Sequence, residues 1–172
     1  MLITITFILF LIGFLFFGSL PFISIYAKRK KEKFFRQLSK EGANNNLIFC
    51  SQEILDNKVL GFDGIHRKIL VLERNREKYT SSIISLDDVA HCQLITDNGI
   101  IEPRDFKTLG EQIRTGVLEL QFEFNNHQQA ASIIFNNGLM KSKREFALLN
   151  AKAEYWCVMF SKMLNQQVSV RA

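Results

Sequence analysis

Residues able to carry out chemistry are few and scattered in this chain of 172 residues. Asp87, Asp88 and His91 suggest a carboxylate–histidine pair at first sight. In a strand, however, Asp88 and His91 point to opposite faces, and Asp87 reaches His91 only across a bend. Carboxylates ahead of a strand commonly bind backbone groups of a turn, so we interpret both as turn residues. No catalytic residue is predicted.

The other histidines and the cysteines do not indicate a metal or nucleophilic site. His66 is expected to face solvent at the start of a strand, and His127 lies in a turn. The sequence contains no HExxH motif and no phosphate-binding glycine motif, and adjacent His91 and Cys92 point to opposite strand faces. We therefore predict no enzyme, no metal and no cofactor. The three cysteines are interpreted as buried, reduced thiols: Cys50, Cys92 and Cys157.

The net charge of +5 comes from one short segment. Residues 28–36, KRKKEKFFR, hold six Lys/Arg and one Glu, and the rest of the chain holds sixteen basic and sixteen acidic residues. Such a local patch does not favour a basic groove for nucleic acid, so no nucleic-acid partner is predicted. The six cations are instead predicted to contact a membrane surface: Lys28, Arg29, Lys30, Lys31, Lys33 and Arg36.

An uncharged apolar run precedes these cations. A helix over its 26 residues spans about 39 Å, more than the roughly 30 Å of a bilayer core. A cleaved signal peptide, the alternative, would have cations ahead of a shorter apolar core. We predict a transmembrane helix over residues 1–27, with the lipid bilayer as a partner. Because the basic residues follow it, the positive-inside rule places the C-terminal domain in the cytoplasm.

The rest of the chain predicts a linker and one domain. Residues 37–46 show no apolar period, so 28–46 are interpreted as a basic juxtamembrane segment and polar linker. Residues 142–166 repeat apolar side chains every three or four positions, which predicts an amphipathic helix with Ser142 and Glu145 as a capping box. Residues 100–116 are interpreted as an extended connection. Seven strands are predicted from alternation and turn signals, at 47–50, 58–62, 65–73, 79–86, 89–96, 117–124 and 129–135.

Antiparallel strands followed by one helix predict a partly open barrel of about seven strands, an α+β and mainly β fold. This order, the segment SIISLDDVAHCQL at 82–94 and Trp156 in the last helix resemble bacterial pleckstrin-homology-like (PH-like) domains that follow a membrane anchor. The resemblance implies a PH-like domain over residues 47–172. Residues 51–58 differ from lipid-binding PH domains because they hold two acidic residues and one lysine, so phosphoinositide recognition is not expected.

Together these observations predict a membrane-anchored, non-enzymatic interaction module whose PH-like domain binds a protein or peptide. One alternative is a membrane-linked small-ligand sensor or enzyme with a pocket between sheet and helix. Another is anionic-lipid binding through the basic segment. The identity of the protein partner and the oligomeric state stay open.

Overall fold

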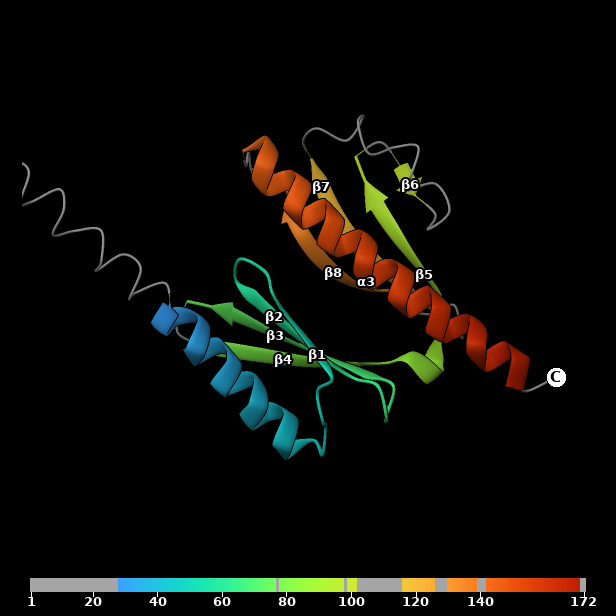
Figure 1. The fold of residues 1–172 in the computed structure, drawn as a ribbon, viewed down its shortest axis with the longest axis horizontal. Coiled ribbons are helices and arrows are strands. Elements are labelled where there is room, and N and C mark those ends of the chain that lie inside the picture. Colours follow the sequence, from blue (N-terminus) through green and yellow to red (C-terminus); the bar gives the residue numbers. More distant parts are fainter. Residues whose placement is uncertain are drawn as a thin grey trace, which may run out of the picture. The chain divides into compact units, whose positions relative to one another are not determined.

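A computed structural model describes residues 28–76, 78–97, 99–101, 116–125, 130–138 and 142–170. The chain divides into two compact units, one ending at Asn46 and one beginning at Leu47. The described part of the first unit is a helix, and the second unit contains two β-sheets and one long helix (Figure 1).

The first unit is helical over residues 28–44, where a polar linker was predicted for its second half. Phe34, Leu38 and Gly42 are spaced by four residues and are buried, so they form one stripe along the helix. Polar residues separate these three positions, so the sequence alone does not reveal the stripe. Asn46, with a φ of 54°, adopts the left-handed conformation common just after a helix.

The first sheet is antiparallel, in the strand order β1-β2-β3-β4. Its inner face is formed by alternate apolar side chains, among them Leu60, Phe62 and Ile69, which are fully or almost fully buried. The strands are β1 (Ser51–Ile54), β2 (Lys58–Asp63), β3 (Lys68–Asn75) and β4 (Lys78–Ser85).

A short 3₁₀ helix, η1 (Leu86–Asp88), leads from β4 into the second sheet, which is antiparallel in the order β6-β5-β7-β8. In β7 the alternation predicted from the sequence is observed, since Leu118, Leu120 and Phe122 are buried and Glu123 is exposed. The strands are β5 (Val89–Thr96), β6 (Gly99–Ile101), β7 (Val117–Phe124) and β8 (Ala130–Asn137).

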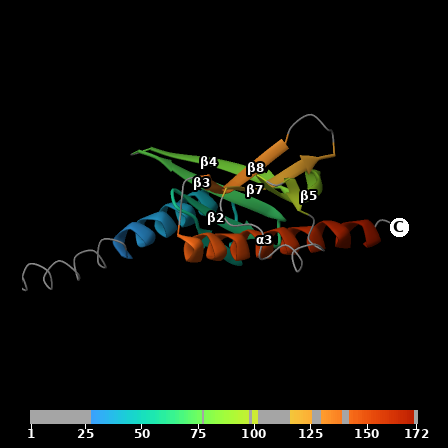
Figure 2. The ribbon, with the colours of Figure 1, turned by 90° about the horizontal axis from the view of Figure 1, so that it is seen from above.

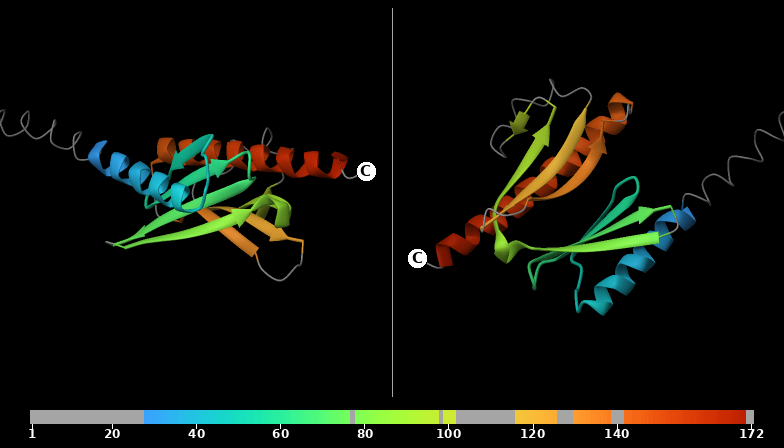
Figure 3. Two further views of the ribbon diagram at one scale, coloured as in Figure 1. Left: turned by 90° about the horizontal axis from the view of Figure 1, so that it is seen from below. Right: turned by 180° about the vertical axis from the view of Figure 1, so that it is seen from behind.

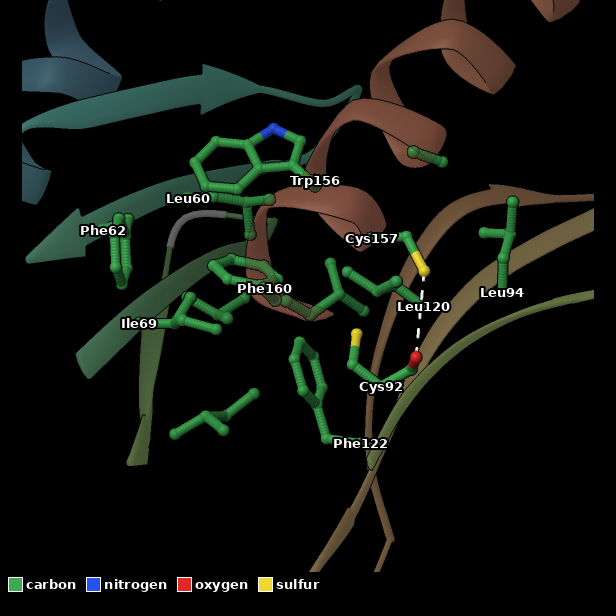
Figure 4. Packing of buried hydrophobic residues seen from close by; sticks show 14 of the residues in the cluster. Leu60, Phe62, Ile69, Cys92, Leu94, Leu120, Phe122, Trp156, Cys157 and Phe160 are labelled. Atoms are coloured by element: carbon green, nitrogen blue, oxygen red, sulfur yellow. Dashed lines mark hydrogen bonds between the residues drawn. The ribbon is translucent and has the colours of Figure 1, made fainter. Parts of the chain in front are cut away.

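The helix α3 (Lys143–Val170) packs on β5, β7 and β8 and lies on one side of the strands (Figure 2). The predicted capping box is confirmed, because Ser142 Oγ accepts from the Glu145 N–H at 3.3 Å while Glu145 Oε2 accepts from the Ser142 N–H at 3.0 Å. Trp156 and Phe160 point from α3 toward the first sheet, whereas Cys157 points toward Cys92 of β5 (Figure 4). One core therefore joins both sheets and the helix.

The barrel prediction is corrected to two separate four-stranded sheets (Figure 3). The predicted strands at 89–96 and 117–124 are confirmed with the same bounds. The predicted strand at 47–50 is wrong, because the Ile48 N–H donates to the Asp63 carboxylate at 2.7 Å rather than to a neighbouring strand. The short strand β6, predicted as part of an irregular connection, supplies the eighth strand and an open edge.

The membrane architecture is also corrected. The transmembrane helix predicted for residues 1–27 lies outside the described residues. Within the described ranges, neither helix is long and apolar enough to cross a membrane. The helix over 28–44 carries seven Lys/Arg, and α3 carries charged residues from its first turn to Lys162. The predictions of a single-pass membrane protein and of a cytoplasmic C-terminal domain are therefore not carried further.

Candidate functional site

A cavity of about 130 Å³ lies between the turn that joins β1 to β2 and the end of β8. Its walls are residues 55–58 of that turn, Glu73 of β3 and residues 134–137 of β8. Two backbone hydrogen bonds shape the turn, from the Leu55 N–H to the Lys58 carbonyl and from the Arg74 N–H to the Asn57 carbonyl. The cavity is thus built from both sheets, and none of its lining residues comes from α3.

A β-bulge in β8 buries a polar side chain in the wall of this cavity. Leu118 of β7 pairs with Asn136, but the next residue, Glu119, pairs with Ile134, so Phe135 is an extra residue in β8. Phe135 and Asn136 are consecutive and both buried, which breaks the usual alternation of a strand. Bulges of this kind commonly re-aim a side chain. Here the bulge turns an asparagine inward.

Only one of the two polar atoms in the Asn136 side-chain amide forms a hydrogen bond. Asn136 is 3% exposed, and its Nδ2 donates to the Gly116 carbonyl at 2.6 Å. Its Oδ1 accepts no hydrogen bond within the described part of the chain. Exchanging the amide oxygen and nitrogen would set two oxygens against each other, so this orientation is defined. An unpaired buried acceptor costs about 1–3 kcal/mol.

The rest of the cavity wall carries an excess of negative charge. Glu73 accepts from Asn57 Nδ2 at 3.0 Å and forms an ion pair with Lys58 Nζ at 3.4 Å. The ammonium of Lys58 is therefore balanced by Glu73. Asp56 is exposed at the turn and adds a second carboxylate. The wall has one cation against two anions.

The strand beside this cavity has an open edge. Among the described strands, β8 pairs only with β7. Its other edge is paired with no strand among the described residues, and an edge of this kind can bind another strand. Ile134 of this strand is 36% exposed and belongs to the cavity wall. The cavity and the open edge form one continuous surface feature, which we call the β8 site, consisting of residues 55–58, Glu73 and β8.

Gly116 supports the β8 site, because its carbonyl binds Asn136 and its φ of 137° disfavours any residue with a side chain. A Cβ here would also overlap the Asp97 carboxylate. We expect Gly116→Ala to lower the unfolding free energy by about 1–3 kcal/mol in urea denaturation. Gly99→Ala is the matched control, since Gly99 has a φ of 113° and open space around its Cβ position. Equal costs for both variants would contradict the overlap.

The six cations predicted as surface contacts all lie exposed on the helix over residues 28–44. Arg29, Lys33 and Arg36 continue to Lys40, with spacings of four, three and four, and so share one face opposite the buried stripe. The sequence analysis did not include Lys40 among the membrane-contacting cations, because Lys40 lies beyond the basic segment 28–36. This helix has seven Lys/Arg and two Glu, so it carries the whole net charge of +5.

The carboxylate–histidine pair that the sequence analysis considered and rejected is not observed among the described residues. Asp87 accepts from Arg67 Nε at 2.8 Å, and His91 is exposed on β5 while Cys92 is buried. Arg67 also donates to the Met163 carbonyl at 3.3 Å. Asp87 thus binds the side chain of Arg67, which in turn contacts α3, and the interpretation that Asp87 binds backbone groups of a turn is not confirmed.

Sequence reasoning missed a buried carboxylate, Asp63. One of its oxygens accepts from the N–H groups of Ile65 and His66, each at 2.9 Å, and the other accepts from the Ile48 N–H and His66 Nδ1, each at 2.7 Å. Burial alone raises the pKa of Asp63, but these hydrogen bonds outweigh it and hold the pKa well below its usual range. The Asp-Gly dipeptide at 63–64 signalled a turn, but not this burial. The Asp63 carboxylate therefore stabilises the turn that follows β2.

The cysteines differ in their environments. Cys50 is exposed, contrary to expectation, whereas Cys92 and Cys157 are buried and unbridged. Cys157 Sγ lies 3.9 Å from the Cys92 carbonyl oxygen (Figure 4). Interaction with the Cys157 thiol and burial both raise the pKa of Cys92. These two thiols are part of the core.

No three His, Cys, Asp or Glu side chains within the described ranges are arranged to hold a metal ion. His127 lies outside those ranges. No family model, no curated protein and no solved structure matches the chain. The β8 site and the cationic helix face are therefore the features from which function is inferred.

Proposed function

We propose that residues 47–172 form a non-enzymatic binding module, and that an extended segment of a partner protein docks along the open edge of β8. The observation that supports this most is the outer edge of β8, which pairs with no described strand and lies beside a cavity that residues 134–137 of the same strand line. The resemblance to PH-like domains, which rests on the sequence alone, is compatible with such a module but does not define its partner.

Strand addition suits this geometry. A segment that pairs with β8 gains main-chain hydrogen bonds along the edge, and its alternate side chains point to one face. One such side chain would enter the cavity, while exposed Ile134 would be covered. The main chain would supply affinity and the cavity would supply specificity.

The lining favours binding over covalent catalysis. The described residues that form the cavity wall include Asn, Asp, Glu and one lysine, but no Ser, Thr, Cys or His. A hydroxyl or thiol nucleophile paired with a histidine is therefore not part of this wall.

Selection of displayed random peptides against the immobilised full chain tests this proposal. We expect selected peptides to bind with an alternating pattern of side chains, and Ile134→Lys to weaken their binding at least about tenfold, because charge on an edge strand opposes pairing. Ile65→Lys is the matched control, since Ile65 is 76% exposed in the turn after β2, outside the β8 site. Failure to select any peptide, or binding that is indifferent to Ile134→Lys, would reject strand docking.

A second candidate function is supported by the cationic face of the helix over residues 28–44. We propose that Arg29, Lys33, Arg36 and Lys40 contact an anionic lipid surface, each contributing on the order of 1 kcal/mol. Reversing all four to Glu is expected to reduce co-sedimentation with vesicles containing phosphatidylserine at least about tenfold. Lys78→Glu in β4 is the single-site control. Equal binding to neutral vesicles, or no effect of 0.5 M salt, would contradict an electrostatic contact.

A further inference from the structure

We infer that two copies of this chain pair through the outer edge of β4, antiparallel and centred on Ser82, so that their first sheets join into one. The inference concerns the sheet that does not contain β8, so it does not rest on the proposed function. Three observations carry it: an edge without protection, main-chain groups that point outward along it, and opposite charges at its two ends.

The first observation is that β4 is the least protected of the described sheet edges. Among the described strands it pairs with β3 alone, over eight residues and without a register shift. Folded proteins usually shorten an edge strand, place a charge or a proline on it, or bend it with a bulge. β1 is short and carries Glu53, β6 has three residues, and β8 has the bulge at Phe135. Residues 79–85 of β4 have none of these features, so nothing in this strand opposes the addition of another strand.

The second observation is the direction of the main-chain groups of β4. Facing residues in an antiparallel pair alternate between those that exchange hydrogen bonds and those that do not. The Leu86 N–H donates to the Arg67 carbonyl at 2.9 Å, and these two residues continue the register in which β4 pairs with β3. The even-numbered residues of β4 therefore bond to β3, whereas Ser81 and Ile83 direct their N–H and C=O groups toward the open edge.

The third observation, charge, favours a second copy over an unrelated strand. Residues 79–85 are uncharged, so two copies do not repel each other along this stretch. Residues 73–78 at one end hold three Lys/Arg and two Glu, whereas η1 at the other end holds two Asp. Antiparallel pairing centred on Ser82 brings exposed Lys78 of each copy opposite the start of η1 in the other, where Asp88 is exposed. Opposite charges at both ends favour this register.

The same register also gives compatible side-chain pairs. Two copies related by a two-fold axis present the same surface to each other, so facing residues must lie on the same face of the joined sheet. Centring on Ser82 meets this condition and sets Ser81 of each copy opposite Ile83 of the other, with their outward main-chain groups hydrogen bonded. The small serine leaves room for Ile83, which is 43% exposed in the single chain and would be partly covered.

Disulfide crosslinking of the full chain tests the inference, in a Cys50→Ser background because Cys50 is the exposed native thiol. In the proposed register the two Ser82 residues face each other as a non-hydrogen-bonded pair, with Cα atoms about 4.5 Å apart, which a disulfide can span. We expect oxidation by copper phenanthroline to link Ser82→Cys into a covalent dimer at least about tenfold more than Thr80→Cys. Thr80 is the matched control, since it is exposed on the same face of β4 but lies opposite residue 84. Equal linking at both positions, or no linking at position 82, would overturn the inference.

A proline at position 81 tests the main-chain pairing separately. Ser81→Pro removes an N–H that points to the open edge, so the bonds between β4 and β3 are kept. We expect it to reduce the linking of Ser82→Cys at least about fivefold, whereas Ser81→Ala leaves the linking unchanged. The fluorescence of buried Trp156, the only tryptophan, reports that each variant is folded. A folded Ser81→Pro chain that links as well as Ser81→Ala would overturn the inference.

Discussion

Replacing Phe160 by alanine is expected to lower the unfolding free energy by about 3–5 kcal/mol. Phe160 is 0% exposed and its ring centroid lies 5.5 Å from that of Phe62, 5.6 Å from that of Phe122 and 5.2 Å from that of Trp156. It therefore touches the first sheet, the second sheet and its own helix. Removing it opens a cavity at the point where all three layers meet.

Urea denaturation of the full chain, followed by circular dichroism, measures this loss. Tyr155→Ala is the control from the preceding turn of the same helix, because Tyr155 is 60% exposed and its truncation is expected to change the unfolding free energy by about 0.5 kcal/mol or less. A Phe160→Ala cost as small as that of Tyr155→Ala would mean that α3 does not join the two sheets as described.

The second large effect is expected at Asp63. Asp63→Asn keeps the shape of the side chain but turns an NH₂ group toward a donor, either the Ile48 N–H or the N–H groups of Ile65 and His66. Buried donors left without acceptors cost about 1–3 kcal/mol each. We expect a loss of about 2–4 kcal/mol at pH 7, measured by urea denaturation. Asp88→Asn, an exposed carboxylate on η1, is the control.

The effect of Asp63 is expected to depend on pH. Its hydrogen bonds hold the folded-state pKa well below the value of about 3.9 for an unfolded chain. The stabilisation is thus fully present above about pH 5 and is lost as the pH falls toward the folded-state pKa, because the unfolded chain takes up the proton first. The stability gap between the natural chain and Asp63→Asn should narrow from pH 6 to pH 2.5. A constant difference in unfolding free energy across this pH range would show that the carboxylate charge does not contribute to stability.

Elements with a strong local pattern were predictable from the sequence. The strand at 117–124 alternates without a break, and α3 combines a 3.6-residue period with a Ser142–Glu145 cap. The helix over 28–44 was not predictable in this way, because few apolar residues mark its buried face. Phe34 and Leu38 are the large apolar side chains in the buried stripe of the helix over 28–44, and polar residues surround them in the sequence.

The β8 site lay beyond sequence reasoning for a physical reason. A bulge changes the face of every later residue in a strand, so alternation assigns Asn136 to the wrong side. The Asn137-Gly138 turn signal also placed the end of this strand at residue 135, before the asparagine that matters. The sequence carries no signal for this bulge, because alternation from Ile133 and Phe135 places residue 136 on the exposed face, where a polar residue is expected.

Hydrogen exchange of the full chain tests the central proposal, that a partner segment docks on β8, most directly. The comparison is between the chain alone and the chain saturated with a displayed-library peptide. Strand addition predicts slower exchange of backbone amides along residues 130–137, with no change along β4, which is the edge strand of the other sheet and serves as the internal control. Unchanged exchange in β8, or equal protection of β4, would contradict docking at this edge.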